Sequence, residues 1–448
     1  MKKHENGGGY REEAGPNLLS RYSISAGDHI KISTENGEIT GLLMPRYESA
    51  SKEYIVIKLK SGYNTGINVR KIKSITKISD KSKEATATNV ATHAVTNNKD
   101  LPIIALISTG GTIASKIDYR TGGVHAALSA DELYASVPEL ANHASIEPEV
   151  LMSEYSENLT PKHWTFIAEK VAEKLKTDKY RGIVISHGTD TMHYTAAALS
   201  FALQNLPVPV VLVGAQRSSD RPSSDAALNL LGATIFAAKS KYSGVFVVMH
   251  AGTSDDVISC HVGTRVRKNH TSRRDAFESI DTNPVAFVRN SEIEVRQNQN
   301  HRLVRRSSNN TVEVNTKFED KVILLKYYPG FDPKLIEHAI NVGHKAIVLE
   351  GTGLGHVGKE CFPFLKKAVE AGLIVCMTSQ CIWGRVGMTV YDTGRDLLDI
   401  GVIPLSDMIS ETATVKAMWA LANTEDIGDV KKIMQKNVAH EISDTIPI

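Results

Sequence analysis

The stretch LPIIALISTGGTIA at residues 101–114 decides the fold, because a mostly apolar run leads directly into a turn with two glycines. An apolar run without polar alternation is typical of a strand buried on both faces of a parallel sheet. Similar runs recur downstream, and we expect strands at 182–186, 208–213 and 244–249. Helical patterns lie between them, and we expect helices at 191–205 and 224–238. This alternation predicts an α/β protein with helices on both faces of its sheet.

A second series of the same kind follows residues 288–320, a polar stretch rich in Asn and Arg that we interpret as an interdomain crossing. The expected strands are 322–327, 345–350 and 373–378. The expected helices are 333–341, 360–371, 411–423 and 426–437. The fold class is therefore α/β, with two doubly wound parallel sheets.

The first hundred residues have a different pattern. Residues 26–78 contain short alternating segments with turn residues at Asn36-Gly37 and Ser61-Gly62, which predicts a small antiparallel β-barrel. The five predicted parts are a flexible tail (1–20), a small basic β-barrel (21–80), a linker (81–100), an N-terminal catalytic domain (101–315) and a C-terminal α/β domain (316–448).

The composition is that of a globular protein with an uneven charge. The 448 residues carry a net charge of +2 and are 42% hydrophobic, which excludes disorder for most of the chain. Residues 21–83 alone hold 12 Lys and Arg against 6 Asp and Glu, a net +6. The basic barrel is thus offset by a mildly acidic remainder.

Cysteine usage and hydropathy indicate a cytoplasmic protein. The four cysteines form no CxxC pair and cannot build a disulfide framework, so we expect a reducing compartment. The opening MKKHENGGGYREE lacks the apolar segment of a secretory signal. No apolar run approaches the roughly 18 residues that a membrane span requires, so we expect no membrane contact.

Glycines and hydroxyls gather where the predicted parallel strands end, which is where enzymes with such sheets bind substrate. The first strand is followed by STGGTIA (108–114) and the second by SHGTDTM (186–192). Alone, TGGTIA is as readily a tight strand-to-helix turn or a phosphate cradle as a catalytic motif, and it lacks the Lys-Ser/Thr of a P-loop, so we do not expect NTP binding. Alone, Asp190 is equally a helix N-cap. The hydroxyls would also suit a nucleophile, and the glycine turns would bring backbone N–H groups close to a ligand.

Together, TGGTIA, HGTDTM and GAQR (214–217), with Asp225 and Asn229, resemble the bacterial-type L-asparaginase family from residue 101 to about 440. The resemblance implies a two-domain asparaginase-like fold and an amidohydrolase with a threonine nucleophile. By position in these motifs, the implied catalytic residues are Thr112 as the nucleophile, Thr189 with its acidic neighbour Asp190, and Lys268 ahead of the Asp275-Ala-Phe277 segment. Weaker matches for substrate binding or a lid are Gly111, Tyr119, Ser156 and Gly188.

These residue types suit the implied chemistry. A threonine hydroxyl is a poor nucleophile at neutral pH and needs a nearby base. A buried lysine can lose its proton at neutral pH, so Lys268 beside Thr189 would relay a proton while Asp190 holds the geometry. Without the resemblance, Lys268 would be interpreted as a solvated charge in a basic run. No metal and no cofactor of this chain's own is expected.

A glycine pattern in the second half suggests a competing interpretation. Gly353-x-Gly355-x-x-Gly358 follows a predicted strand and opens a helix, as a dinucleotide fingerprint does. The next strand, however, ends in Thr378-Ser379-Gln380 and supplies no acid for a ribose. We therefore expect a turn close to a neighbouring active site, since the resemblance implies that each site is built across a pair of subunits.

The extra front domain sharpens the resemblance. GDHIKI (27–32) and GLLMP (41–45) resemble the opening of the D subunits of archaeal glutamyl-tRNA(Gln) amidotransferases. That family implies that glutamine is hydrolysed to ammonia, which a partner, the E subunit, uses with ATP and Mg to convert Glu-tRNA(Gln) to Gln-tRNA(Gln). It also implies a homodimer within a D2E2 heterotetramer that binds tRNA(Gln).

Two uncertainties of function stay open at this stage. The basic barrel is either a solvated surface whose lysines protect its strand edges or a docking surface for RNA or a partner subunit. The chain as a whole is alternatively a stand-alone cytosolic L-asparaginase, because preference for Asn or Gln depends on pocket depth. A non-catalytic RNA-binding protein on a degenerate scaffold is disfavoured by the joint presence of Thr112, Thr189, Asp190 and Lys268.

Overall fold

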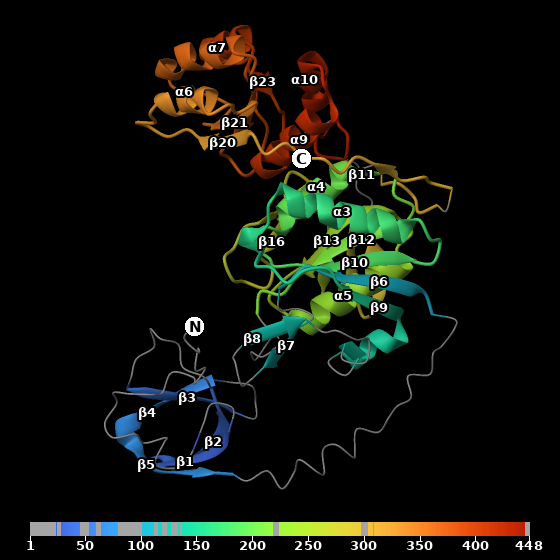
Figure 1. Cartoon of the computed structure of the whole chain (residues 1–448), viewed down its shortest axis with the longest axis vertical. Coiled ribbons are helices and arrows are strands. Elements are labelled where there is room, and N and C mark those ends of the chain that lie inside the picture. Colours follow the sequence, from blue (N-terminus) through green and yellow to red (C-terminus); the bar gives the residue numbers. More distant parts are fainter. Residues whose placement is uncertain are drawn as a thin grey trace, which may run out of the picture.

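The computed structural model describes most of the chain beyond the N-terminus. The described residues are 24, 28–44, 53–59, 64–78, 101–111, 115–118, 123–126, 133–134, 137–217, 224–296, 303–307 and 309–443. The predicted tail (1–20) and linker (81–100) lie outside them. Figure 1 shows two α/β parts stacked along the long axis, with an all-β part near the N-terminus.

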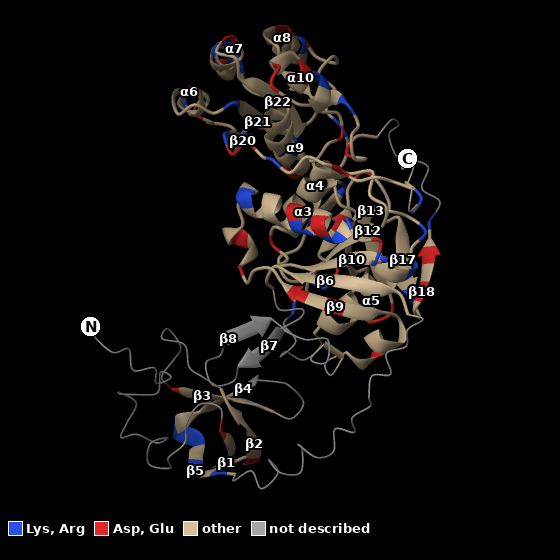
Figure 2. Cartoon of the chain, turned by 45° about the vertical axis from the view of Figure 1, so that its right-hand side comes forward, with Lys and Arg blue, Asp and Glu red and all other residues tan. Residues whose placement is uncertain are grey.

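The N-terminal part is a five-stranded antiparallel sheet in the order β4-β3-β2-β1-β5. Its strands are β1 (His29–Thr34), β2 (Gly37–Leu43), β3 (Tyr54–Lys58), β4 (Asn64–Asn68) and β5 (Ile72–Lys77), with a 3-10 turn η1 (Val69–Lys71) before β5. Alternate side chains, among them Ile30, Ile32 and Ile75, are fully buried in one core. The period-2 pattern of the sequence is therefore an inward-facing apolar row. In Figure 2 the ribbon beside β5 carries the blue of Lys and Arg.

The large sheet has eight strands in the order β18-β17-β14-β13-β12-β10-β6-β9. Five are parallel neighbours: β13 (Gly244–His250), β12 (Pro209–Val213), β10 (Gly182–Ser186), β6 (Ile103–Ser108) and β9 (Ser145–Val150). Three form an antiparallel edge: β14 (Ile258–Val262), β17 (Ala286–Arg289) and β18 (Glu292–Val295). The expected α/β class is confirmed, and the antiparallel edge is an addition that the alternation of strands and helices does not predict.

Helices cover both faces of this sheet. On β6, Ile104 and Leu106 pack in the core that contains α5 (Ala226–Lys239). The intervening Ala105 and Ile107 pack in the core that contains α3 (Pro161–Leu175) and α4 (Met192–Ala202). Because successive residues of a strand face opposite sides, α5 lies on one face and α3 with α4 on the other, as Figure 1 shows.

The C-terminal part is a four-stranded parallel sheet in the order β20-β21-β22-β23. The strands are β20 (Val322–Lys326), β21 (Ala346–Gly351), β22 (Ile374–Ser379) and β23 (Ile403–Pro404). One face packs against α6 (Lys334–Asn341), α7 (Phe362–Glu370) and α8 (Asp392–Ile400). The other packs against α9 (Ser410–Asn423) and α10 (Ile427–Gln435).

The two α/β parts share one apolar core across their junction. Phe201 of α4 stacks on Trp419 of α9 with ring centroids 5.7 Å apart. Ala197 and Trp164 join the same buried cluster as Val348 and Cys376 of the C-terminal sheet. The junction is therefore a packed interior, and α9 lies between the two sheets.

The structure adds detail to two sequence expectations. Residues 288–320, interpreted as an interdomain crossing, also contain β18 and the short strand β19 (Glu313–Val314). The glycine-rich segment 353–358 leads into a 3-10 turn, η4 (Lys359–Cys361), before α7 begins. A β carbon at Gly355 would lie 2.9 Å from Met377 Cγ, so this glycine serves close packing within the C-terminal part.

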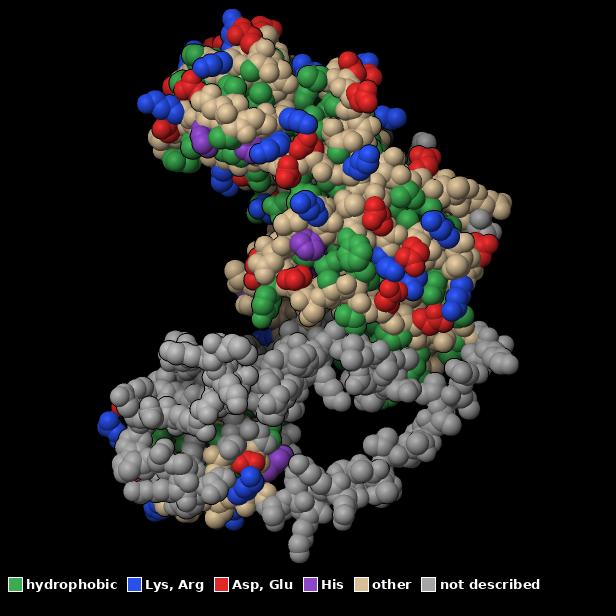
Figure 3. Space-filling model, in the orientation of Figure 1, with side chains coloured by type: hydrophobic (Ala, Val, Ile, Leu, Met, Phe, Trp, Pro, Cys, Tyr) green, Lys and Arg blue, Asp and Glu red, His purple; other side chains and the backbone are tan. Residues whose placement is uncertain are grey.

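The surface of both α/β parts is mixed in charge. Figure 3 shows Lys and Arg side chains interspersed with Asp and Glu on the visible described face, without a large field of one sign. Among the described residues, no helix is long and apolar enough to cross a membrane.

Candidate active site

The two threonine motifs leave adjacent strands of the large sheet side by side. Strands β6 and β10 pair in parallel with Ser108 opposite Ser186, and the two hydroxyls lie 3.1 Å apart. Thr109 then donates two hydrogen bonds to the Ser186 carbonyl, from its backbone N at 3.0 Å and its Oγ1 at 2.9 Å. These buried contacts fix the starting point of both loops at the carboxyl end of the sheet.

Two glycines allow the first loop to enter a narrow space. Gly111 has φ +77°, and a β carbon there would lie 2.8 Å from the His187 carbonyl oxygen and 2.9 Å from the Gly188 nitrogen. Gly110 has φ +127°, and its β carbon would lie 2.2 Å from the Glu154 carbonyl oxygen. The TGGT turn is thus held between the HGTDT loop and the loop at 154–156, where only glycine fits.

The lysine that the sequence predicts to be catalytic reaches the second motif. Lys268 ends β15 (Val266–Lys268), which forms a two-stranded hairpin with β16 (Phe277–Ser279). Its Nζ lies 2.9 Å from Thr189 Oγ1 and 2.7 Å from Asp190 Oδ1. The Lys268 side chain is 8% exposed and that of Asp190 is 67% exposed, so the ion pair lies at the mouth of a site that opens to solvent at Asp190.

A buried neutral histidine stiffens the HGTDT loop. The ring of His187 lies 2.6 Å from the Gly188 carbonyl and 2.9 Å from Thr195 Oγ1. Because a carbonyl only accepts, Nδ1 donates to Gly188 and Nε2 accepts from the Thr195 hydroxyl. Burial lowers the pKa of His187 to about 4, so the ring is uncharged at neutral pH. It therefore holds the loop without adding a charge next to Lys268.

A buried carboxylate orders the loop after β12. Asp225 accepts hydrogen bonds from the backbone N of Gln216 at 3.0 Å and of Arg217 at 2.9 Å. Asn229 donates to the same carboxylate at 2.9 Å and to the Gly214 carbonyl at 3.0 Å. A β carbon at Gly214 would lie 2.7 Å from Thr189 Cγ2, so this ordered loop forms the wall behind the Thr189 side chain.

The structure gathers most of the described candidates in one place. Ser156 is 3% exposed, and its Cβ and Oγ lie within 3.0 Å of the β carbon that Gly188 lacks. Gly111, Ser156, Gly188, Thr189, Asp190 and Lys268 thus belong to one constellation. Thr112 and Tyr119 lie outside the described residues.

The sequence does not predict two ion pairs that lie next to the site. Arg267, next to Lys268, pairs with Glu411 of α9 at 2.9 Å, and Arg265 pairs with Asp407 at 3.0 Å. These partners lie more than a hundred residues apart, and no local pattern joins them.

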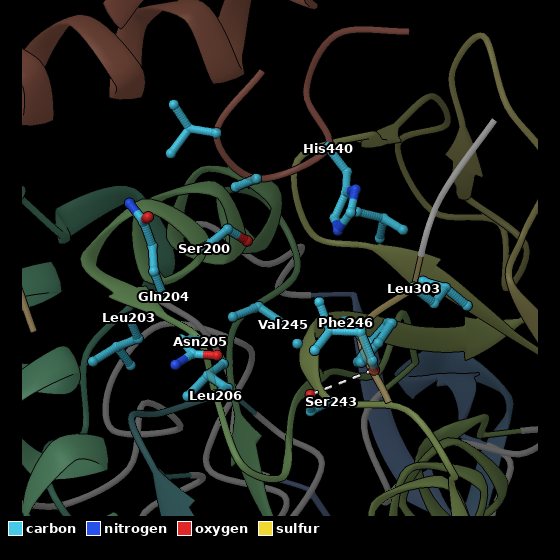
Figure 4. Close-up of a pocket in the computed structure, with 15 residues that line it drawn as sticks. Ser200, Leu203, Gln204, Asn205, Leu206, Ser243, Val245, Phe246, Leu303 and His440 are labelled. Carbon is cyan, nitrogen blue, oxygen red and sulfur yellow. Dashed lines mark hydrogen bonds between the residues drawn. The ribbon is translucent and has the colours of Figure 1, made fainter. Parts of the chain in front are cut away.

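The described part of the chain contains other cavities but no metal-binding cluster. No group of three or more His, Cys, Asp or Glu side chains there is arranged to hold a metal ion. A cavity of about 110 Å³ lies between α4, β13 and residues 438–440, with walls that include Leu203, Phe246 and His440 (Figure 4). None of the described candidate residues lines this cavity.

Comparison with sequence families and solved structures agrees with this geometry. Residues 103–301 match the asparaginase N-terminal family and residues 321–434 match the glutaminase/asparaginase C-terminal domain. The L-asparaginase of Thermococcus kodakarensis is 34% identical, with a TM-score of 0.69 over 77% of this chain and 100% of that one. L-asparaginase I of Vibrio cholerae is 30% identical, with a TM-score of 0.66 over 76% and 99%. The fold and the motif loops therefore define a protein of the asparaginase class.

The N-terminal sheet narrows this assignment. Residues 24–78 match the GatD N-terminal domain. The D subunit of the glutamyl-tRNA(Gln) amidotransferase of Pyrococcus abyssi is 48% identical over 95% of this chain and 90% of its own length. The protein of the same name from Methanopyrus kandleri is 44% identical over 97% and 94%. The chain belongs to the family of glutamyl-tRNA(Gln) amidotransferase D subunits, and the expected resemblance is confirmed.

Proposed function

We propose that this protein hydrolyses the carboxamide of glutamine with a threonine nucleophile and so supplies ammonia to a partner subunit. The observation that carries the proposal is the position of Lys268 Nζ, within 2.9 Å of both Thr189 Oγ1 and Asp190 Oδ1. An uncharged amine that contacts a hydroxyl can accept its proton, and the ammonium that forms is stabilised by a neighbouring carboxylate until the proton is passed on. A threonine nucleophile requires such a group to accept the proton of its hydroxyl.

The proposed reaction has two halves. The Thr112 hydroxyl oxygen attacks the carboxamide carbon, and its proton passes through Thr189 and Lys268 to the leaving nitrogen. The C–N bond breaks, ammonia leaves, and a γ-glutamyl ester of Thr112 remains. Water then adds to the ester carbon, the bond to Thr112 breaks, and glutamate and the free hydroxyl are produced.

The glycine turns support the charged intermediate of each half. The two loops come into close contact where Gly111 lies against His187 and Gly188, and we propose that backbone N–H groups of this region face the substrate. Donors fixed in this way stabilise a developing oxyanion, and losing one such donor costs roughly 10²–10³ in rate in other enzymes. Ser156 and Tyr119 are proposed to contact the substrate or a lid over it.

The wider role follows from the family. We propose that a partner, the E subunit, binds ATP and Mg and uses the ammonia to amidate Glu-tRNA(Gln), while this chain binds no cofactor itself. We further propose a homodimer of this chain within a D2E2 heterotetramer that binds tRNA(Gln) and acts in the cytoplasm. The names of the relatives, each a subunit of an amidotransferase, support this arrangement.

The test is ammonia release from glutamine by the isolated chain, and again with the E subunit, ATP and Glu-tRNA(Gln). We expect the complete mixture to release ammonia faster and to form Gln-tRNA(Gln). Thr112→Ala should abolish ammonia release in both cases. An unchanged rate in Thr112→Ala would refute the threonine mechanism, and a rate that ignores both partner and tRNA would refute the coupled role.

A second candidate is a stand-alone L-asparaginase. It is favoured by the structural likeness to L-asparaginases, which extends over 77% of this chain. It uses the same residues and differs in substrate and partner. Hydrolysis of free asparagine at a kcat/KM above that for glutamine, with no protein bound to the affinity-purified native chain, would support it over the first candidate.

A further inference from the structure

The hairpin that carries Lys268 is tied at both ends to the C-terminal part of the molecule. Strand β15 pairs with β16 in a two-stranded sheet separate from the eight-stranded one. Just before it, Thr264 Oγ1 donates to the Ala439 carbonyl at 2.8 Å, and Thr412 Oγ1 donates to the Thr264 carbonyl at 2.9 Å. After β16, the Asp281 carboxylate accepts from the Gly384 N–H at 2.8 Å. Both ends of the hairpin are therefore anchored to the C-terminal part.

Alternate side chains of β15 serve different partners. Val266 is fully buried in the core under α4, and Lys268 reaches Thr189 and Asp190. The intervening residues, Arg265 and Arg267, reach carboxylates of the C-terminal part. Since successive side chains of a strand point to opposite faces, the arginines hold the strand from the side that faces away from Lys268.

The two arginine pairs differ in their surroundings. Arg265 is completely buried and also donates to the His440 and Asp407 carbonyls and to Ser443 Oγ, so it holds the whole junction together. Arg267 Nε pairs with Glu411 Oε1 at 2.9 Å, and the carboxylate of Glu411 is only 10% exposed. Arg267 is the nearest of these anchors to Lys268 in the chain.

Glu411 stands on the helix that contacts both sides of the site. It lies in the first turn of α9, where the helix dipole favours a negative charge. The same helix packs along α4, which begins directly after Thr189-Asp190-Thr191. Helix α9 therefore contacts both sides of the site. It packs against α4, which follows the HGTDT loop, and its Glu411 pairs with Arg267 of β15.

We propose that Arg267 and Glu411 are a positioning pair that sets Lys268 Nζ against Thr189 and Asp190. Neither residue needs to touch substrate. The pair fixes the position of β15 relative to the HGTDT loop. Lys268 Nζ can then donate to Thr189 Oγ1 at 2.9 Å and to Asp190 Oδ1 at 2.7 Å. This inference rests on the proposed amidohydrolase function, because it assigns the pair a role in that reaction.

The test compares Glu411→Gln with Glu337→Gln. Glutamine keeps the volume of the side chain and removes its charge, and Glu337 is the matched control because it forms an interhelix ion pair with Lys367 in the same part of the molecule. We expect Glu411→Gln to lower kcat for ammonia release by about 10- to 100-fold, as small displacements of reacting groups do, with KM within about twofold of the wild type. Glu411→Asp should recover part of the loss, and Glu337→Gln should leave kcat unchanged.

A crystal structure of Glu411→Gln separates this inference from the proposed function. We expect Lys268 Nζ to leave hydrogen-bonding distance of Thr189 Oγ1 or Asp190 Oδ1. If the wild type releases no ammonia from glutamine or asparagine, the proposed function fails and this distance alone decides the positioning role. Unchanged Lys268 contacts, or a kcat within twofold of the wild type, would overturn the inference. So would an equal loss of kcat in Glu337→Gln.

Discussion

Lys268 is the residue on which the proposed chemistry depends most directly. Replacing Lys268 by methionine keeps the side chain at a similar length and removes the nitrogen that contacts both Thr189 and Asp190. We expect ammonia release to fall by about 10²–10⁴, the usual contribution of a positioned acid or base. Lys432→Met, which removes a surface lysine paired with Asp429, is the control and should keep the full rate. A Lys268→Met enzyme within threefold of the wild type would exclude the relay.

Gly111 offers a purely steric test of the same site. In Gly111→Ala the new β carbon would lie 2.8 Å from the His187 carbonyl oxygen, so the TGGT and HGTDT loops must separate. Gly330→Ala is matched, since that glycine has φ +89° with nothing within 4 Å of its β carbon. Both variants incur the backbone cost of a positive φ, roughly 1–2 kcal/mol. We expect only Gly111→Ala to lose activity at least tenfold; equal activities would mean that the loop contact is unimportant.

At the scale of residues, the sequence predicts the members of the site that belong to recognisable motifs. Gly188, Thr189 and Asp190 are contiguous, and Lys268 is found from a motif, so the structure places them together as the pattern indicates. The pairing of Arg267 with Glu411 joins residues 144 positions apart (411 minus 267) and depends on how two domains pack. Such a contact leaves no periodic trace in one sequence.

Among the elements, the loop after β12 owes its shape to the start of α5. The Asp225 carboxylate accepts two backbone N–H groups and one amide N–H while fully buried. In Asp225→Asn one acceptor becomes a donor at a fully buried position, where the new amide faces a backbone or side-chain N–H from which it cannot accept a hydrogen bond. We expect a loss of about 2–3 kcal/mol in the free energy of unfolding, because a stranded buried donor is costly. Urea denaturation measures it.

The matched variant for this element is Asp426→Asn. Asp426 caps α10 by accepting from the Asp429 N–H at 2.9 Å, at an exposed position. Asparagine caps helices about as well as aspartate, so the change in stability should be below about 0.5 kcal/mol. If the two variants lose equal stability, burial of the Asp225 carboxylate is not what orders the loop.

Element boundaries show where tertiary contacts override local pattern. The sequence predicts a helix over 191–205, but α4 ends at Ala202 because Leu203 and Gln204 pair with Val314 and Glu313 as strands β11 (Leu203–Gln204) and β19. The sequence does not predict helix α8, because Gly394 lowers the helix propensity of residues 392–400. A β carbon there would lie 2.2 Å from the Met388 carbonyl, so packing requires this glycine.

On the scale of the whole molecule, the shared core explains why the two α/β parts act together. The cluster around Phe201 and Trp419 draws residues from both sheets, and the buried Arg265–Asp407 pair crosses the same junction. Sequence periodicity predicts two series of strands and helices, but it carries no information on which helix lies between them. The position of α9 is therefore a product of the folded state alone.

The free energy of unfolding should decrease as the pH is lowered, because several buried histidines have lowered pKa values. Burial lowers the pKa of His187 to about 4 and the pKa values of His193 and His261 to about 3, against an ordinary value of 6.5. Below pH 6.5 the unfolded chain takes up protons that the folded chain does not. Each histidine therefore contributes stability that is fully present above pH 6.5 and is lost on acidification, at about 1.4 kcal/mol per pH unit.

Urea unfolding between pH 6.5 and 5 tests this expectation, with His261→Gln as the comparison. The ring of His261 forms hydrogen bonds with the Ser259 and Ser279 hydroxyls and stands outside the proposed reaction. Burial raises the pKa values of Glu411 and Asp281, which act in the opposite sense, so the difference between wild type and variant isolates the histidine. Over this range we expect the slope of stability against pH to be smaller in His261→Gln by about 1 kcal/mol per pH unit, because the unfolded ring is only half protonated at about pH 6.5. Parallel slopes would mean that His261 is protonated in the folded protein, and its two serine contacts would then have to be explained by a charged ring.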